Sequence, residues 1–460
     1  MSASRLAVLV FVVFLIAPAP GAAAEGGVYL YLQPLPPEAA RLTFALASVS
    51  AITTSGSELP LDVSLTNVTP GDAARQRLLA GGRLPAGSYA GFLFRVKRAE
   101  LKGGGASAAL AIPTEAARLD FPFSVGGRQA HVFWLSLRYQ ESVVDDATFS
   151  PVFSAVAPSR PIVGHAGFVT NAGSSTIVVF DKHLGQAVAA IDACAGPSGM
   201  ALDQRTRRLY VACPKDEEIV AIDIAAAEVV DRARVSPGDR PSEVALTPDG
   251  RTLLVVNTGS SSVVFFGAGS LARQERVAVG NGPGSVAIDP SGARAFVFNT
   301  LSDTVSVIDV PGRSVVGTLS TDAAPLRGQF NGRGDRLYVI HERSPYMTVL
   351  NPQALAVVAK ARLRAAASAI AVDRVRGLVC LGSSRSPAIE FYDPNALLPL
   401  YTMRAGAGVS HLTIDMEDNA LYMVSPETHS VRVGRLADRR IGAEIDVGDR
   451  PYRVAVMGER

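Results

Sequence analysis

The chain has 460 residues, enough for more than one domain, and 48% of them are apolar, with 42 glycines and 29 prolines. That composition excludes a disordered chain, a coiled coil and a collagen-like helix. The 44 basic and 42 acidic residues give a net charge of +2. Because so balanced a charge creates no long-range attraction to phosphates, we expect no nucleic-acid partner.

Residues 1–24 have the features of a cleavable signal peptide. Arg5 supplies a positive start, residues 6–17 are an uninterrupted apolar stretch, and three alanines precede Glu25. As a helix that stretch spans about 18 Å, less than the roughly 30 Å hydrocarbon core of a bilayer. We therefore predict cleavage after residue 24, no transmembrane segment in the mature chain, and a periplasmic or secreted protein.

Motifs for cofactors, metals and catalysis are absent from the sequence. The three cysteines form no C-x-x-C or C-x-x-C-H motif, which leaves c-type haem, thioredoxin-like redox chemistry and a Cys-rich zinc site unsupported. The six histidines include no H-E-x-x-H, and no G-x-S-x-G occurs. The sequence therefore predicts no cofactor, no metal site and no catalytic residue.

A repeat of about 42 residues organises the second part of the chain. One marker closes an apolar run at steps of 42, 44, 42, 42, 42 and 42 residues, at Asp181, Asp223, Gly267, Asp309, Asn351, Asp393 and Arg435. A second marker precedes another apolar run at one step of 44 and five of 42, at Pro197, Pro241, Pro283, Pro325, Ala367, Val409 and Pro451. Both markers give seven copies.

Each copy has the pattern of four antiparallel strands. Its short alternating runs are rich in Val, Ile, Phe and Tyr and are bounded by Gly, Pro, Asp and Asn. Four strands repeated in this way are typical of a β-propeller blade. The array begins near Gly167 without a first strand and ends with a lone strand at 452–457. We therefore predict that the two fragments pair and close a seven-bladed ring, which removes the exposed sheet edges.

Four segments of this array carry a family resemblance. They are Phe168-Val169-Thr170-Asn171, Val447-Gly448-Asp449-Arg450-Pro451, Pro248-Asp249-Gly250 and Thr304-Val305-Ser306-Val307-Ile308-Asp309. They resemble the YVTN-type repeats of bacterial and archaeal surface-layer and periplasmic propellers, and the resemblance extends over all the copies. It implies a seven-bladed propeller. It implies no single activity, because similar rings occur in sugar lactonases, in heavy chains of quinoprotein amine dehydrogenases and in proteins with no known chemistry.

Residues 25–156 lack the repeat and are expected to form a separate domain, so the whole fold is predicted to be all-β. Strands are expected at 28–33, 42–52, 88–96, 108–112 and 131–139, and a short helix at 72–79. The segments 84–89 and 149–153 are similar to those of a prealbumin-like sandwich of bacterial envelope proteins, which implies a β-sandwich. Residues 157–161, with two prolines, are the expected linker to a propeller at 162–460.

The innermost strand of each blade is expected to line the central channel with alternate residues. Two residues past the second marker are Gly199, Glu243, Ser285, Arg327, Ala369, His411 and Arg453. Four residues past it are Ala201, Ala245, Ala287, Gln329, Ala371, Thr413 and Ala455. The channel is therefore predicted to be narrow, with a ring of mixed charge near one mouth.

The charged members of this ring are the candidate ligand site. We expect Arg327, His411 and Arg453 to hold an anionic or polar ligand, with Glu243 facing them. The full set of candidates at the mouth is Glu243, Arg327, His411, Arg453, Arg240, Arg450 and His341. The alternative is that these charges are solvated or pair with one another.

The cysteines carry a separate prediction. Cys194 precedes the innermost strand of its copy, and Cys213 ends the neighbouring strand. Antiparallel pairing places both at the same face, so we expect a disulfide, which export permits, worth on the order of 3 kcal/mol. Cys380 lies within a strand and is expected to be a buried thiol.

These features favour an exported, non-catalytic binding or scaffold protein. Its propeller would be a platform for a protein, glycan or small polar ligand, with a partner in the cell envelope. Loops of nearly constant length support this function, because propeller enzymes usually need inserted loops to build a pocket. The alternative is a lactonase-like hydrolase that uses Glu243, Arg327 and His411, or a cofactor-free heavy chain of a periplasmic dehydrogenase.

Overall fold

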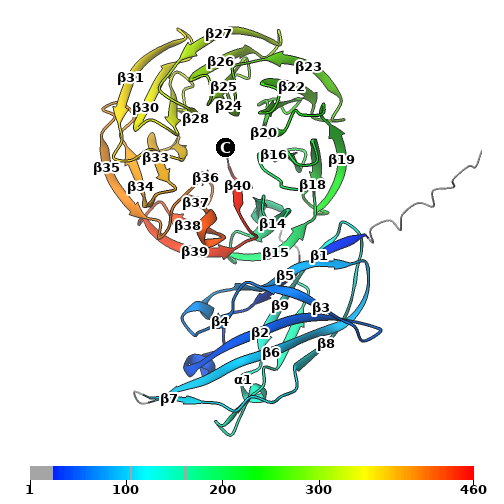
Figure 1. Cartoon of the computed structure of the whole chain (residues 1–460). Helices are drawn as coiled ribbons and strands as arrows, with labels where there is room; N and C mark the ends of the chain where they lie inside the picture. Colours follow the sequence, from blue (N-terminus) through cyan, green and yellow to red (C-terminus); the bar gives the residue numbers. More distant parts are fainter. Residues whose placement is uncertain (1–23, 104–105, 160–162, 460) are drawn as a thin grey trace, which may run out of the picture.

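The computed structural model describes residues 24–103, 106–159 and 163–459. The predicted signal peptide lies outside these residues, apart from Ala24, and so does the end of the expected linker. Within the described ranges, no helix is both long and apolar enough to span a bilayer. Two groups of strands make up the molecule (Figure 1).

The N-terminal group is a β domain. Its strands are β1 (Glu25–Leu32), β2 (Leu42–Thr53), β3 (Glu58–Val63), β4 (Asn67–Val68), β5 (Arg77–Pro85), β6 (Gly87–Gly103), β7 (Ala106–Ala109), β8 (Ala117–Val125), β9 (Ala130–Leu137), β10 (Val143–Val144), β11 (Thr148–Phe149) and β12 (Phe153–Val156). Short helices are η1 (Pro37–Arg41), η2 (Asp72–Ala74) and α1 (Tyr139–Ser142). Ten strands form one sheet in the order β12-β9-β1-β5-β3-β2-β6-β7, with β4 on β2 and β8 on β6.

This ten-stranded sheet encloses one hydrophobic core. Leu30 of β1, Phe44 of β2, Phe92 of β6 and Leu135 of β9 belong to a single buried cluster, although their strands are spread along the sheet. The strands must therefore curve around a shared interior. The resemblance to a prealbumin-like sandwich remains a prediction.

The short helix predicted at 72–79 is confirmed only over its first turn. Only η2 is helical there, and the chain continues as β5, which pairs antiparallel with β1 along its length. Gly81 of this strand lies against Tyr29 of β1, since a Cβ at this position would lie 2.6 Å from Cδ1 of Tyr29. The aromatic ring of β1 thus packs flat on a glycine of β5, a long-range contact that the local pattern of residues 77–80 does not reveal.

The second group is a propeller of seven four-stranded sheets. Blade 1 combines β13 (Ala166–Asn171), β14 (Thr176–Asp181) and β15 (Gln186–Ile191) with β40 (Pro451–Val456). Blades 2 to 4 consist of β16 (Met200–Asp203), β17 (Arg208–Cys213), β18 (Glu218–Asp223), β19 (Glu228–Arg234), β20 (Pro241–Leu246), β21 (Thr252–Asn257), β22 (Ser262–Gly267), β23 (Arg273–Ala278), β24 (Pro283–Ile288), β25 (Arg294–Asn299), β26 (Thr304–Asp309) and β27 (Ser314–Ser320). Blades 5 to 7 consist of β28 (Pro325–Phe330), β29 (Leu337–His341), β30 (Tyr346–Asn351), β31 (Ala356–Arg362), β32 (Ala369–Asp373), β33 (Leu378–Ser383), β34 (Ser386–Tyr392), β35 (Pro399–Arg404), β36 (His411–Asp415), β37 (Ala420–Ser425), β38 (Ser430–Arg435) and β39 (Arg440–Asp446). Two short helices, η3 (Val163–His165) and η4 (Pro426–Thr428), precede β13 and β38.

The ring closes as predicted. The C-terminal strand β40 pairs antiparallel with β13, with Ala455 opposite Phe168 and Val454 opposite Val169. The innermost strands of neighbouring blades contact each other around the whole ring, including β36 with β40 and β40 with β16 (Figure 1). The seven-bladed all-β propeller predicted from the repeat is confirmed.

Neighbouring blades are held together by apolar side chains from both faces of the inner strands. Val244 of β20 packs in a cluster with residues of blade 2. The alanines four residues past the second marker also enter such clusters, as Ala371 does between blades 6 and 7 and Ala455 does between blades 1 and 2. These small residues therefore allow close packing of the blades as well as a narrow channel.

The N-terminal domain packs against the outer strands of the propeller. Tyr31 and Val132 share a buried cluster with Phe180 of blade 1. The indole Nε1 of Trp134 donates a 2.8 Å hydrogen bond to the carbonyl oxygen of Ala187 in β15. The domain thus covers part of an edge strand that would otherwise be exposed.

A carboxylate at the end of β39 anchors the same interface. Asp446 accepts hydrogen bonds from Arg75 Nη1 at 2.6 Å, Arg77 Nε at 2.8 Å and the Leu78 backbone N–H at 3.1 Å. The tyrosine hydroxyl of Tyr31 donates to the Asp446 carbonyl oxygen at 3.3 Å. Ion pairs and apolar contacts therefore join the domain to blades 1 and 7.

Candidate functional site

The predicted mouth ring alternates large and small residues except where blades 7 and 1 meet. Its large polar residues come from blades 1, 3, 5 and 7, and they are Arg453, Glu243, Arg327 and His411. The residues between them come from blades 2, 4 and 6, and they are Gly199, Ser285 and Ala369. His411 and Arg453 come from adjacent blades, and the other large side chains can reach one another over the small residues between them.

The start of the inner strands sets the direction of these side chains. In β20 and β28 the pairing register shifts between the marker proline and the residue two positions later, at Pro241/Glu243 and Pro325/Arg327. The pairing of β13 with β40 has the same irregularity, so Tyr452 is an extra residue opposite the partner strand. A β-bulge of this kind bends the strand and re-aims the side chains beside it.

Glu243 and Arg453 form an ion pair that passes over blade 2. The Nη1 of Arg453 contacts Oε1 of Glu243, whose side chain is only 2% exposed. Gly199 lies beneath this pair, and a Cβ there would be 2.3 Å from Glu243 Oε1. Burial opposes the charge of Arg453, but the carboxylates of Glu243 and Glu459 outweigh it and raise its pKa.

His411 is buried beside two cations. Burial lowers its pKa well below the ordinary value of 6.5, and the charges of Arg453 and Arg327 lower it further. The imidazole is therefore neutral at neutral pH. Its Nδ1 is buried and has no hydrogen-bond partner among the described residues.

Arg327 has no carboxylate partner. Its guanidinium carbon lies 5.7 Å from the centroid of the Tyr452 ring, which is within the range of a cation–π contact. No ion pair within 4.0 Å joins Arg327 to an acidic residue of the described chain, and its Nε is buried without a hydrogen-bond partner. Arg327 thus contributes a positive charge that the protein leaves uncompensated at the mouth.

Three of the buried polar atoms without a partner belong to this ring. Within the described residues, Arg327 Nε, His411 Nδ1 and Glu243 Oε2 are all buried without a partner. Buried polar atoms in folded proteins are almost always paired with protein, water or a ligand, because an unpaired group loses its solvation without compensation. The mouth therefore offers two nitrogens and a carboxylate oxygen to a bound molecule.

The opposite end of the channel is narrowed by the chain after β40. The hydroxyl of Thr413 in blade 7 donates a 2.5 Å hydrogen bond to Glu459 Oε1, and the Gly458 N–H donates to Gln204 Oε1 of blade 2 at 3.2 Å. Burial raises the pKa of Glu459 above its ordinary value of 4.5. In Figure 1 this part of the chain runs toward the centre of the ring. Glu459 was missed by sequence reasoning because it follows the last repeat.

Three candidates from the sequence do not join the ring. Arg240 and Arg450 have left-handed backbones with φ of 50° and 47°, and both side chains are exposed next to the mouth. Arg450 lies 3.7 Å from Asp449. His341 is fully buried at the end of β29, where its Nδ1 forms a 3.0 Å hydrogen bond with the Tyr346 carbonyl oxygen across the turn to β30. Burial lowers its pKa, and its position is that of a turn-stabilising residue.

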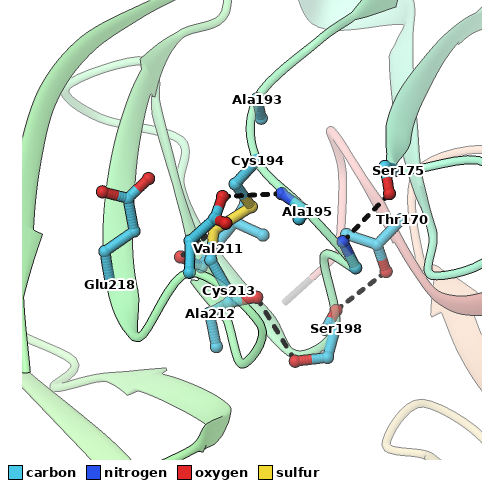
Figure 2. Close-up of a disulfide and its surroundings, with 12 residues drawn as sticks. Thr170, Ser175, Ala193, Cys194, Ala195, Ser198, Val211, Ala212, Cys213 and Glu218 are labelled. Carbon is cyan, nitrogen blue, oxygen red and sulfur yellow. Dashed lines mark hydrogen bonds between the residues drawn. A yellow bond between two sulfur atoms is a disulfide. The ribbon is translucent and has the colours of Figure 1, made fainter. Parts of the chain in front are cut away.

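A disulfide joins Cys194 and Cys213 next to the mouth (Figure 2). It connects the loop before β16 to the end of β17. In the same loop, the Ser198 carbonyl oxygen accepts a 2.8 Å hydrogen bond from Thr170 Oγ1 of blade 1. The disulfide therefore stabilises the loop that links blades 1 and 2. Cys380 is a buried free thiol, and its burial raises its pKa.

A second cavity, of about 620 Å³, lies away from the ring. It is bounded by β9 of the N-terminal domain and by β15 and β19 of the propeller. Among its lining residues, Asp192 lies 2.8 Å from Arg83, and Arg232 contacts Glu218. The Nε2 of His131 is buried there without a hydrogen-bond partner among the described residues. The volume of this cavity is suitable for a ligand.

Comparison with known proteins agrees with the propeller fold. Residues 164–326 match the family described as "Lactonase, 7-bladed beta-propeller". Over these residues the chain is similar to lactonase-type propellers. The matched segment spans blades 1 to 4 and includes Glu243, whereas Arg327, His411 and Arg453 lie beyond it. No curated protein sequence matches the chain.

Solved structures share the propeller fold. Hydrazine synthase of Kuenenia stuttgartiensis is similar with a TM-score of 0.54 and 17% identity, over 61% of this chain and 96% of that one. A functionally unknown protein of Desulfotomaculum acetoxidans has a TM-score of 0.57 and 12% identity, over 64% and 100%. The dihydro-heme d1 dehydrogenase NirN has a TM-score of 0.52 and 13% identity, over 65% and 78%. At such low identity these likenesses show the fold alone.

Proposed function

We propose that the protein is an exported, non-catalytic binding protein whose propeller holds a small polar or anionic ligand at the mouth of its channel. The observation that carries the proposal is the group of three buried, unpartnered polar atoms, Arg327 Nε, His411 Nδ1 and Glu243 Oε2. A ligand with an anionic group and hydrogen-bonding groups would satisfy them together.

Binding explains the ring better than catalysis does. The Glu243 carboxylate is already engaged by Arg453, so it is less free to reach a reacting group. The N-terminal domain packs on the outer strands at blades 1 and 7, away from the mouth. This domain is a second module for a protein or glycan of the cell envelope, and the protein acts in the periplasm or outside the cell.

Calorimetry with small organic anions at low ionic strength tests the proposal. Arg327→Ala is expected to abolish binding, because it removes the uncompensated cation. The matched control is Arg333→Ala, which removes an exposed arginine from the turn between β28 and β29 of the same blade and so changes the net charge equally. Binding that survives Arg327→Ala, or that is lost equally in both variants, would reject the mouth as the site.

A lactonase-like hydrolase is the second candidate. Two observations favour it: the family match over residues 164–326, and a neutral His411 that can accept a proton beside the positive charge of Arg327. Hydrolysis of a sugar lactone that stops in His411→Asn and Glu243→Gln would establish this activity and reject the non-catalytic one. The dehydrogenase heavy-chain alternative rests on the sequence resemblance alone.

A further inference from the structure

The charges of the mouth are distributed unequally between its two arginines. Glu243 contacts Arg453, and the carboxylate of Glu459 also acts on Arg453 from the opposite end of the channel. Neither carboxylate forms an ion pair with Arg327, and the neighbouring His411 is neutral at neutral pH. Arg453 is therefore paired with a carboxylate, whereas Arg327 has no ion-pair partner among the described residues.

The orientation of Arg327 suits a carboxylate. Its guanidinium lies over the ring of Tyr452, and its buried Nε has no hydrogen-bond partner among the described residues. A carboxylate matches the edge of a guanidinium with two parallel hydrogen bonds, whereas a neutral ligand gains no charge-assisted bond there.

The remaining unpaired atoms define the rest of the ligand. Glu243 Oε2 is the second oxygen of the carboxylate that Arg453 contacts, and a carboxylate oxygen accepts hydrogen bonds, so it requires a donor such as a hydroxyl group. His411 Nδ1 bonds a hydroxyl in either tautomer, because a hydroxyl both donates and accepts. A second negative charge on the ligand would face Glu243 with no further cation of the ring to compensate it, which is costly in a buried site.

We propose that the mouth selects a small hydroxylated monocarboxylate and discriminates against dianions. This inference rests on the proposed binding function and adds the charge and chemical class of the ligand. Arg327 binds the carboxylate of the ligand, and His411 and Glu243 bind its hydroxyl groups. The Glu243–Arg453 ion pair has no net charge, so it does not attract a second anionic group.

Four six-carbon probes test the proposal by calorimetry on the folded full chain at pH 7.5 and low salt. They are D-gluconate, which is a hydroxylated monoanion, D-glucarate, which is the corresponding dianion, D-glucitol, which is neutral, and hexanoate, which lacks hydroxyl groups. Gluconate is expected to bind at least about tenfold more tightly than each of the other three. Glucarate binding as tight as gluconate binding would overturn the inference while the proposed function stands.

The variant Glu243→Gln gives a second, opposite test. It removes one negative charge with little change of shape, so Arg453 loses its ion-pair partner and the net charge of the mouth rises by one. We expect the preference to move at least about tenfold toward glucarate relative to gluconate. An unchanged ratio in a variant with the melting temperature of the parent would contradict the charge assignment. Failure of the parent protein to bind any of the four probes would overturn both this inference and the proposed function.

Discussion

Gly199→Ala is the sharpest stability test of the mouth geometry. In blade 6 the equivalent residue is Ala369, so a methyl group fits this ring position where nothing crosses it. In blade 2 the added Cβ would lie 2.5 Å from the Cα of Glu243 and 2.7 Å from the Ser242 carbonyl oxygen. Both are backbone atoms, so β20 itself must move. Overpacking of this kind costs about 1–3 kcal/mol, and the displaced Glu243 should also weaken ligand binding.

Urea unfolding followed by circular dichroism measures this cost. The matched control is Gly284→Ala at the start of β24, where an added Cβ would meet only Thr300 Cγ2, at 3.7 Å. The control is expected to be neutral or to gain up to about 1 kcal/mol, because alanine restricts the unfolded chain. A Gly199→Ala protein as stable as the control would show that Glu243 does not pass over blade 2, and the argument for the ion pair would fail.

Three further predictions follow from the fold. Replacing Cys194 and Cys213 by serine should lower the free energy of unfolding by about 3 kcal/mol, seen as a lower urea midpoint; equal midpoints under oxidising conditions would contradict the disulfide. Because the pKa of His411 is lowered in the folded state, the free energy of unfolding should decrease as the pH falls below about 6.5. The variant His411→Asn should lose less stability between pH 7.5 and about 5. Equal losses of stability in the two proteins would contradict the burial of His411 as a neutral group. Asp446→Ala should cost about 2 kcal/mol by freeing two arginines at the domain interface, whereas the exposed Asp438→Ala should cost little; equal midpoints would mean that the interface does not depend on this carboxylate.

The propeller could be predicted from the sequence because the strand pattern of each blade lies within about 42 consecutive residues and is repeated along the chain. The spacing between markers gives the number of blades, and the phase of the first and last copies gives the pairing of β13 with β40. The mouth residues could also be found by counting from the markers, since equivalent positions in equivalent strands reach the same height in the ring. The count identified Arg327 and His411 without any structural input.

The pairing within the ring could not be predicted in the same way. It depends on contacts between non-adjacent blades, and the Glu243–Arg453 pair exists because Gly199 leaves space between them. Arg240 precedes a mouth strand in the sequence, but its side chain is exposed to solvent. Its left-handed backbone belongs to the turn that precedes β20. In the N-terminal domain, β5 is a strand because it pairs with β1, and no local pattern encodes that partner.

The most direct test of the central claim is a crystal structure of the protein with D-gluconate. We predict density at the channel mouth, with the carboxylate on the Nε edge of Arg327 and hydroxyl groups within hydrogen-bond distance of His411 Nδ1 and Glu243 Oε2. Gluconate bound instead in the cavity between β9, β15 and β19, or a mouth in which Arg327 is paired with a carboxylate of the protein, would contradict the account.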